Sequence, residues 1–183
     1  MIKVDSHMQY VSREAANEGM PQDVTARNTR EGKYLTFSLK DEEYGIEILK
    51  VKEIIGIMNI TTIPQTPPYV KGVINLRGKV IPVIDLCLKF GMEESVYTDR
   101  TCIVVVDTYG KDQGNFLIGI VVDSVSEVVN IRGDEIEDTP SFGVSLDNNY
   151  FLGMAKVKGD VKILLDIDRV LTSDLVMVGT LVQ

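Results

Sequence analysis

Residues 70–90, VKGVINLRGKVIPVIDLCLKF, have the pattern of a β-hairpin that leads into a short helix. Alternate residues of the first strand share one face of it: Val70, Gly72, Ile74 and Leu76. Gly78 can adopt the positive φ that a two-residue turn requires, so the turn is placed there. Pro82 has no N–H to donate to a ladder, which predicts an edge strand or a neighbouring bulge. Asp85 then stands at the N-cap position of the helix, and Gly91 follows its end at C′.

The same pattern returns at residues 151–171, FLGMAKVKGDVKILLDIDRVL. The matched positions keep one constant offset: Gly72 with Gly153, Gly78 with Gly159, and Asp85 with Asp166. An earlier segment is repeated too, because residues 44–53 correspond to residues 118–127. The repeating unit is far longer than the roughly 20–50 residues of solenoid repeats. The chain is therefore predicted to be mainly β, with two copies of one small β module.

The chain has 183 residues, of which 44% are apolar and 25% charged, the mixture of a globular protein. Its apolar runs are much shorter than the about 20 residues of a transmembrane helix, and no secretory signal is visible, so membrane insertion is not expected. Cys87 and Cys102 have no metal or redox spacing and are expected to be reduced. The net charge of −8 disfavours binding to nucleic acids and to anionic lipids.

Composition predicts how the chain is divided. Residues 1–32 are polar and show neither structural period, so they are predicted to be a disordered N-terminal tail. Residues 33–176 form the folded domain, with a first module at about 33–92 and a second at about 100–171. Exchange of strands between the two modules is left open. Residues 177–183 are predicted to be a C-terminal tail.

Catalytic chemistry finds little support in the sequence. The single histidine, His7, lies in the predicted tail, which leaves no imidazole in the folded region for a nucleophile or for a metal. Phosphate-binding and dinucleotide-binding fingerprints are missing, and no cofactor is predicted. Asp85 and Asp166 could form a catalytic carboxylate pair, but each already has a role as a helix cap. A hydrolase that uses these carboxylates and a small β nucleic-acid module are the alternatives, tested by activity assays on variants and by binding at low salt.

Two charged residues of the first module have two interpretations each. Arg77 is either a solvated turn residue or an exposed, rigidly mounted guanidinium of the kind enriched in interfaces. Glu53 is either a solvated charge or the acidic member of an interface. Val51, close to Glu53 in the sequence, is a candidate apolar contact.

Three segments together resemble the CheW family of chemotaxis coupling proteins: EEYGIEILKVKEI at 42–54, TPPYVKGVINLRG at 66–78 and VIPVIDL at 80–86. The resemblance covers about residues 32–175, and the same domain is similar to the regulatory domain of the kinase CheA and to part of CheV. It implies two pseudo-symmetric, five-stranded, SH3-like β-barrels, packed together with short helices and with a groove between them. Both halves of the sequence carry it, in agreement with the repeat.

The resemblance also implies a function, that of a non-catalytic adaptor without cofactor or metal. Such an adaptor joins the cytoplasmic tips of methyl-accepting chemotaxis receptors to the regulatory domain of CheA. It is cytoplasmic and is recruited to receptor arrays at the membrane. The family positions implicated in partner contact correspond to Val51, Glu53, Gly72 and Arg77. The receptor tip is expected in the groove between the barrels, and the kinase domain is expected to pack barrel to barrel.

Overall fold

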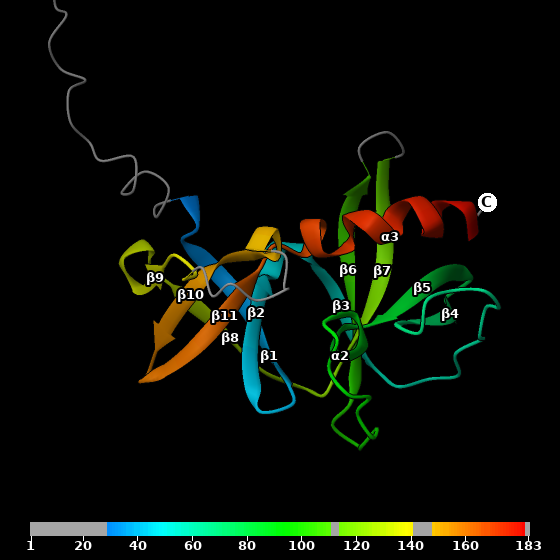
Figure 1. Ribbon diagram of the computed structural model, residues 1–183, viewed down its shortest axis with the longest axis horizontal. Coiled ribbons are helices and arrows are strands. Elements are labelled where there is room, and N and C mark those ends of the chain that lie inside the picture. Colours follow the sequence, from blue (N-terminus) through cyan, green and yellow to red (C-terminus); the bar gives the residue numbers. More distant parts are fainter. Residues whose placement is uncertain (1–28, 111–113, 141–147, 182–183) are drawn as a thin grey trace, which may run out of the picture.

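Two mixed β-sheets form most of the computed structural model, which describes residues 29–110, 114–140 and 148–181 (Figure 1). Module A is the six-stranded sheet, and its strands in spatial order are β8 (Ser124–Ile131), β1 (Gly32–Leu39), β2 (Glu42–Glu47), β11 (Asp160–Leu165), β10 (Phe151–Val157) and β9 (Ile136–Glu137). Module B is the five-stranded sheet, with the order β3 (Val51–Gly56), β6 (Cys102–Gly110), β7 (Gly114–Val122), β5 (Lys79–Asp85) and β4 (Val70–Leu76). The mainly β prediction is confirmed, and the sixth strand of module A is the two-residue β9.

Short helical elements connect the strands. They are the 3₁₀ turns η1 (Ile48–Lys50), η2 (Gly133–Glu135) and η3 (Asn148–Tyr150), and the helices α2 (Leu86–Lys89) and α3 (Ile167–Leu181). Helix α3 starts at the end of β11 in module A and lies against β6 of module B (Figure 1). It is therefore the element that bridges the two modules at the top of the molecule.

Each module takes strands from both halves of the chain. In module A, β2 from the first half pairs in parallel with β11 from the second, at Tyr44 and Ile163. In module B, β5 pairs in parallel with β7, at Val83 and Gly119. The continuous division at about 33–92 and 100–171 therefore differs from the structure, which shows strand exchange. The chain crosses between the modules at η1 and again after Asp123, so each copy of the repeat completes the sheet of the other.

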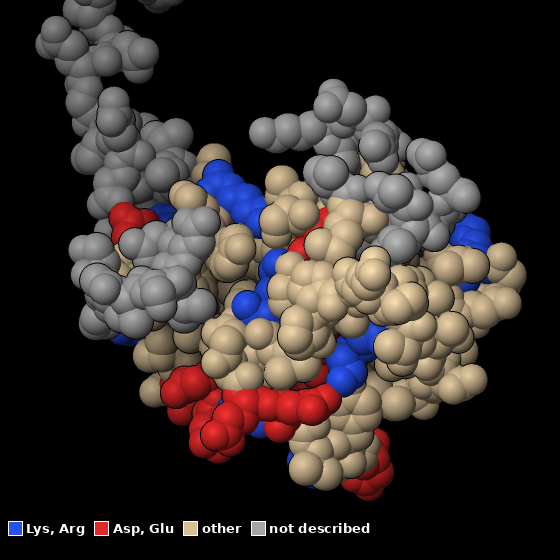
Figure 2. Space-filling model, turned by 45° about the vertical axis from the view of Figure 1, so that its right-hand side comes forward, with Lys and Arg blue, Asp and Glu red and all other residues tan. Residues whose placement is uncertain are grey.

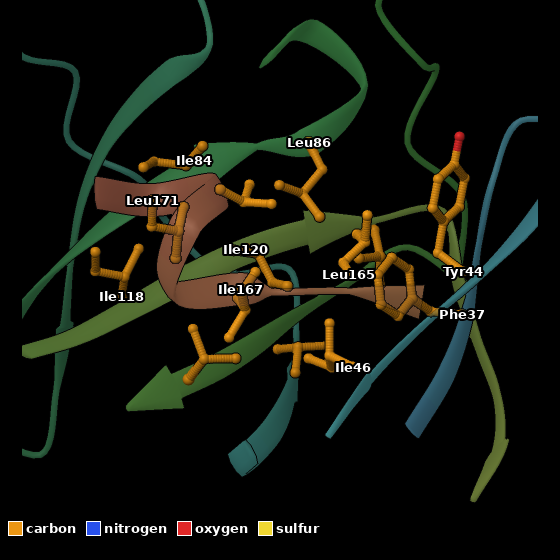
Figure 3. Close-up of a cluster of buried hydrophobic side chains, with 14 of the residues drawn as sticks. Phe37, Tyr44, Ile46, Ile84, Leu86, Ile118, Ile120, Leu165, Ile167 and Leu171 are labelled. Atoms are coloured by element: carbon orange, nitrogen blue, oxygen red, sulfur yellow. The ribbon is translucent and has the colours of Figure 1, made fainter. Parts of the chain in front are cut away.

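One central hydrophobic core joins the modules (Figure 3). Phe37 and Ile46 come from module A, and Ile84, Ile118 and Ile120 come from module B. The side chains of Ile167 and Leu171 on α3 complete the cluster. One smaller cluster lies inside each module, around Tyr34 and Ile131 in module A and around Ile74 and Ile103 in module B. Because both modules contribute to the central core, they are held together by burial of apolar surface.

The two hairpin turns are equivalent in geometry. Arg77 and Gly78 have φ values of 50° and 83°, and Lys158 and Gly159 have φ values of 52° and 87°. Two successive residues with positive φ define the type I′ turn, which matches the right-handed twist of the strands. The predicted positive φ of both glycines is confirmed.

Replacing Gly78 or Gly159 by valine is expected to cost about 1–2 kcal/mol of folding free energy, because a β-branched residue is disfavoured at positive φ. A Cβ at either position meets no atom within 4 Å, so the cost comes from the backbone alone. Thermal unfolding followed by circular dichroism measures it. Gly56→Val is the control, since Gly56 also has open space but no positive φ. Unchanged midpoints in both turn variants would contradict the argument.

Both predicted helix caps are confirmed. The Asp85 carboxylate accepts a hydrogen bond from the Leu88 N–H at 3.1 Å, and the Asp166 carboxylate accepts one from the Arg169 N–H at 3.2 Å. Pro82 is not on an edge strand, because β5 lies between β7 and β4. Its missing N–H is tolerated because the parallel pairing of β5 with β7 begins one residue later, at Val83. The other alternative, a neighbouring bulge, agrees with the register shift in the β4–β5 ladder.

The ends of the folded region lie farther out than the sequence predicted. Helix α3 runs to Leu181 and so takes in most of the predicted C-terminal tail, 177–183. At the other end, Arg30 donates hydrogen bonds to the Leu152 carbonyl at 2.6 Å and to Asp138 at 2.8 Å, which ties the last residues of the predicted tail to module A. Residues 1–28 of that tail lie outside the described residues.

Candidate functional site

Arg77 and Glu53 form a bidentate ion pair on module B. Arg77 Nη1 lies 2.6 Å from Glu53 Oε1, and Nη2 lies 2.8 Å from Oε2. Glu53 belongs to β3 at one edge of the sheet, whereas Arg77 lies in the turn between β4 and β5 at the opposite edge. The pair therefore bridges the two edges that meet when the sheet curls. The sequence placed both residues on the surface but did not predict their contact.

The ion pair is accessible to solvent. The Arg77 side chain is 74% exposed and the Glu53 side chain 27%. The hydrogen bonds from Arg77 lower the pKa of the Glu53 carboxyl, and those to Glu53 raise the pKa of Arg77, so both groups are charged at neutral pH. Glu53 occupies only part of the donor set of the guanidinium, which has five N–H groups in a fixed fork. Arg77 can therefore bind a second acceptor without leaving Glu53.

Gly72 and Val51, the other two predicted contact residues, are less accessible. Gly72 is buried in β4 at φ 138°, and a Cβ there would lie 2.0 Å from the carbonyl oxygen of Thr61. The glycine allows the chain at Thr61 to lie close beside β4, where Thr61 and Val73 exchange two backbone hydrogen bonds of 2.9 Å in an antiparallel bridge. Val51 is half-buried and packs against the central core. The structure thus brings Glu53 and Arg77 together and gives Gly72 a structural role.

Module A carries an equivalent ion pair that the sequence analysis did not identify. Lys158 Nζ lies 3.4 Å from the carboxylate of Glu127. These residues occupy the same repeat positions as Arg77 and Glu53. Lys158 precedes Gly159 in the hairpin turn, and Glu127 lies on β8, the strand that follows the second crossing between the modules. The repeat offset that matched the glycines would have found them. The pair is weaker in geometry because a single ammonium replaces the guanidinium fork.

Exposed aliphatic side chains also follow the repeat. Ile54 and Val80 of module B are 44% and 47% exposed, and their counterparts in module A, Val128 and Val161, are 49% and 50% exposed. Isolated exposed aliphatic residues are common on protein surfaces. Here they recur at matched positions, so each module carries one exposed ion pair and two exposed aliphatic side chains at equivalent places in its sheet.

A cavity of about 230 Å³ opens at the junction of the modules, between η1 and the start of α3. Its lining combines Lys50 with the carboxylates of Glu47, Asp166 and Asp168. Lys50 Nζ lies 2.5 Å from Asp168 and 4.6 Å from the ring centroid of Tyr109. The neighbouring Leu49 is 87% exposed. The cavity therefore has a charged lining, and Leu49, which precedes Lys50 in the chain, is exposed.

Groups suited to catalysis or metal binding are scarce in the described part of the chain. Asp85 and Asp166, the candidate carboxylate pair, each bond to a helix N-terminus as described above. Within the described ranges, no group of three or more His, Cys, Asp or Glu residues is arranged to hold a metal ion. Among the same residues, no helix is long and apolar enough to cross a membrane. Burial raises the pKa of both free thiols, Cys87 and Cys102, which keeps them protonated and unreactive at neutral pH.

The charge distribution on the face shown in Figure 2 matches the acidic composition. Carboxylates gather along its lower edge, while the Lys and Arg side chains of the described residues are scattered over the face. A surface that follows a nucleic-acid backbone needs a continuous basic stripe, which this face does not show among its described residues.

Comparison with known proteins agrees with this architecture. The CheW-like domain model matches residues 33–175. The chemotaxis protein CheW of Klebsiella aerogenes is 40% identical over 141 residues, which cover 77% of this chain and 82% of that protein. The CheW of Helicobacter pylori is 35% identical over 77% of this chain and 82% of its own length.

A solved structure shows the same fold. The scaffolding protein TtCheW from Thermoanaerobacter tengcongensis superimposes with a TM-score of 0.68 at 35% sequence identity, over 76% of this chain and 92% of that one. The family model extends from β1 into α3 and therefore spans both modules. The chain belongs to the CheW-like domain family.

Proposed function

We propose that this chain is a non-catalytic adaptor that couples methyl-accepting chemotaxis receptors to the histidine kinase CheA. The solved relative is a scaffolding protein, and the related sequences are chemotaxis proteins. The observation that carries the proposal is the exposed bidentate pair of Glu53 and Arg77, at positions that the family resemblance assigns to partner contact. The pair is mounted on a type I′ hairpin and an edge strand, so it presents its charges in a fixed orientation.

The regulatory domain of CheA is the proposed partner of the module B face. Since that domain resembles the CheW fold, the two can pack barrel to barrel with pseudo-symmetry. Glu53 and Arg77 provide charge-assisted hydrogen bonds there, and the exposed side chains of Ile54 and Val80, on β3 and β5, provide apolar surface beside the pair. Val51 and Gly72 act from beneath this face, Val51 through packing and Gly72 through the path of the chain at Thr61.

The receptor tip is proposed to bind in the groove between the modules. A helical hairpin that lies in a groove is recognised by apolar anchors and by polar groups along the rim. The junction near η1 provides the exposed Leu49 and the charged groups around Lys50 and Asp168. In this arrangement the adaptor works in the cytoplasm and is recruited to receptor arrays at the membrane.

Arg77→Ala and Glu53→Ala are expected to weaken capture of at least one partner roughly thirtyfold, the effect of losing an interface hot spot. Their thermal midpoints should remain close to wild type, because the side chains are on the surface and the turn depends on Gly78. Glu53→Lys should weaken binding more than Glu53→Ala if the opposing surface is basic. Binding is measured separately with the CheA regulatory domain and with a receptor cytoplasmic fragment.

Arg132→Ala is the matched control. Arg132 also forms an exposed ion pair, with Asp134, but it lies at η2 in module A. It should bind both partners like the wild type. Unaltered binding of both partners by Arg77→Ala and Glu53→Ala would remove these residues from the proposed contacts. Absence of any binding by the wild-type chain would refute the adaptor function itself.

A further inference from the structure

Strand β7 has a free edge in module B. Its ladder with β6 covers all nine residues, from Gly114 to Val122, but its parallel ladder with β5 includes only Gly119–Val121. Figure 1 shows β5 and β7 diverging from their point of pairing, with β7 continuing upward beyond β5. Among the described residues, positions 114–118 therefore have no ladder partner on the β5 side. An unpaired row of N–H and C=O groups is a template for another strand.

Two adjoining cavities border this free edge. The first has a volume of about 340 Å³, and the second has a volume of about 520 Å³. They share four lining residues: Lys79, Ile81, Asn115 and Leu117. The two cavities are therefore the two sides of one wedge between β5 and β7.

The two sides of the wedge differ in chemistry. On one side the cavity is lined by Val80, Pro82 and Phe116, and Phe116 packs against the central core. On the other side Ile81 and Leu117 belong to the cluster inside module B, and the rim carries charged groups. These rim groups are three basic and two acidic residues: Lys52, Arg77, Lys79, Glu53 and Asp107. Arg77 pairs with Glu53 and Lys52 pairs with Asp107 at 3.1 Å, so the net positive charge of the rim is that of Lys79.

Module A shows that the fold does not require this opening. By the repeat offset, Ile81 corresponds to Lys162 and Leu117 corresponds to Glu43. In module A these two residues form an ion pair, and Lys162 is only 6% exposed, so polar side chains bridge the equivalent wedge. In module B the same positions are apolar and line cavities. An ion pair therefore occupies the positions in module A that apolar side chains occupy in the wedge of module B.

We propose that the free edge of β7 is a strand-addition site for an extended peptide segment of a partner, with alternating apolar and acidic residues. Strand addition satisfies the backbone groups of 114–118, and successive side chains of an added strand point to opposite faces. The apolar residues would enter the cavity at Val80 and Phe116, and the acidic residues would face the basic rim at Lys79. The site shares Val80, Glu53 and Arg77 with the proposed kinase face, but its test requires neither the kinase nor a receptor.

The test uses the full chain, labelled with ¹⁵N, and an eight-residue end-capped peptide in which valine and glutamate alternate. The expected result is a saturable shift of the backbone amides of residues 114–118, with slower hydrogen exchange there. A valine–lysine peptide of the same length should bind at least tenfold more weakly. The valine–glutamate peptide N-methylated at alternate residues should also bind at least tenfold more weakly, because it cannot pair with the edge.

Variants separate this site from general binding to exposed apolar surface. Lys79→Glu and Val80→Glu should each weaken binding of the valine–glutamate peptide at least fivefold while leaving the remainder of the spectrum unchanged. Val161→Glu is the matched control, because Val161 has the same repeat position as Val80 and nearly the same exposure, and it should bind like the wild type. No shift at residues 114–118, equal binding of the N-methylated peptide, or equal loss in Val161→Glu would overturn the proposal. Since the probe is a synthetic peptide, its failure leaves the adaptor function untouched.

Discussion

Gly72→Ala is expected to destabilise the protein by about 3 kcal/mol or more, which places it among the largest effects of a single substitution. The new Cβ would lie 2.0 Å from the Thr61 carbonyl oxygen and 2.7 Å from its carbonyl carbon, both backbone atoms that no rotamer change can move. The φ of 138° adds strain for any residue with a side chain. In a chain of this size such a loss lowers the thermal midpoint by about 10 °C.

Gly153→Ala tests whether a side chain at the equivalent glycine of the second copy also destabilises the protein. Gly153 has φ 153°, and a Cβ would lie 2.7 Å from the Glu137 carbonyl oxygen. The effect should be large but smaller than at Gly72, because the clash is less close. Gly56→Ala is the control, with open space around its Cβ, and should change the midpoint little. A Gly72→Ala variant with a thermal midpoint near wild type would show that the chain at Thr61 can move away. That result would contradict the structural role assigned to Gly72.

Asp174→Ala is expected to cost about 3–5 kcal/mol of stability, the usual effect of removing one partner from a buried ion pair. Asp174 Oδ2 lies 2.6 Å from Lys89 Nζ, and these side chains are 0% and 5% exposed. Tyr69 donates its hydroxyl to Asp174 Oδ1 at 2.9 Å, and its ring centroid lies 4.7 Å from Lys89 Nζ. Removing the carboxylate leaves a buried ammonium without its counter-charge and a phenol without its acceptor.

A double replacement distinguishes lost charge pairing from lost packing. Lys89→Met combined with Asp174→Leu removes both charges, and its stability should be much closer to wild type than that of Asp174→Ala. The exposed pair of Lys71 and Glu94 is the comparison, since Glu94 is 61% exposed and Glu94→Ala should hardly change the midpoint. Chemical denaturation at neutral pH measures all variants. Equal losses in Asp174→Ala and in the double variant would assign the effect to packing.

These two predictions involve contacts that the sequence did not reveal. Asp174 lies in the part of α3 that extends beyond the length of its repeat counterpart α2, where the repeat gives no guidance. Its partners, Lys89 and Tyr69, are distant in the sequence and are brought to it by the path of α3 from module A onto module B. Sequence periodicity describes one element at a time and cannot say which elements meet.

The features that the sequence determined are local. The hairpin turns at Gly78 and Gly159 and the N-caps Asp85 and Asp166 depend on a few adjacent residues, and all four agree with the structure. The alternation of apolar residues identified β4, and the constant offset identified the duplication. The family resemblance added the double-barrel architecture, which the comparisons support.

The tertiary structure alone decided which strands share a sheet and which charges meet. Strand exchange arises because β2 and β5 find their parallel partners in the other copy of the repeat, a choice between alternative edges with similar local sequences. The curling of the module B sheet brings Glu53 to Arg77, although their strands lie at opposite edges of the sheet. The short pairing of β5 with β7 leaves residues 114–118 without a partner on that side. Pairing between distant segments depends on the free energy of the whole packed core, which no short stretch of sequence contains.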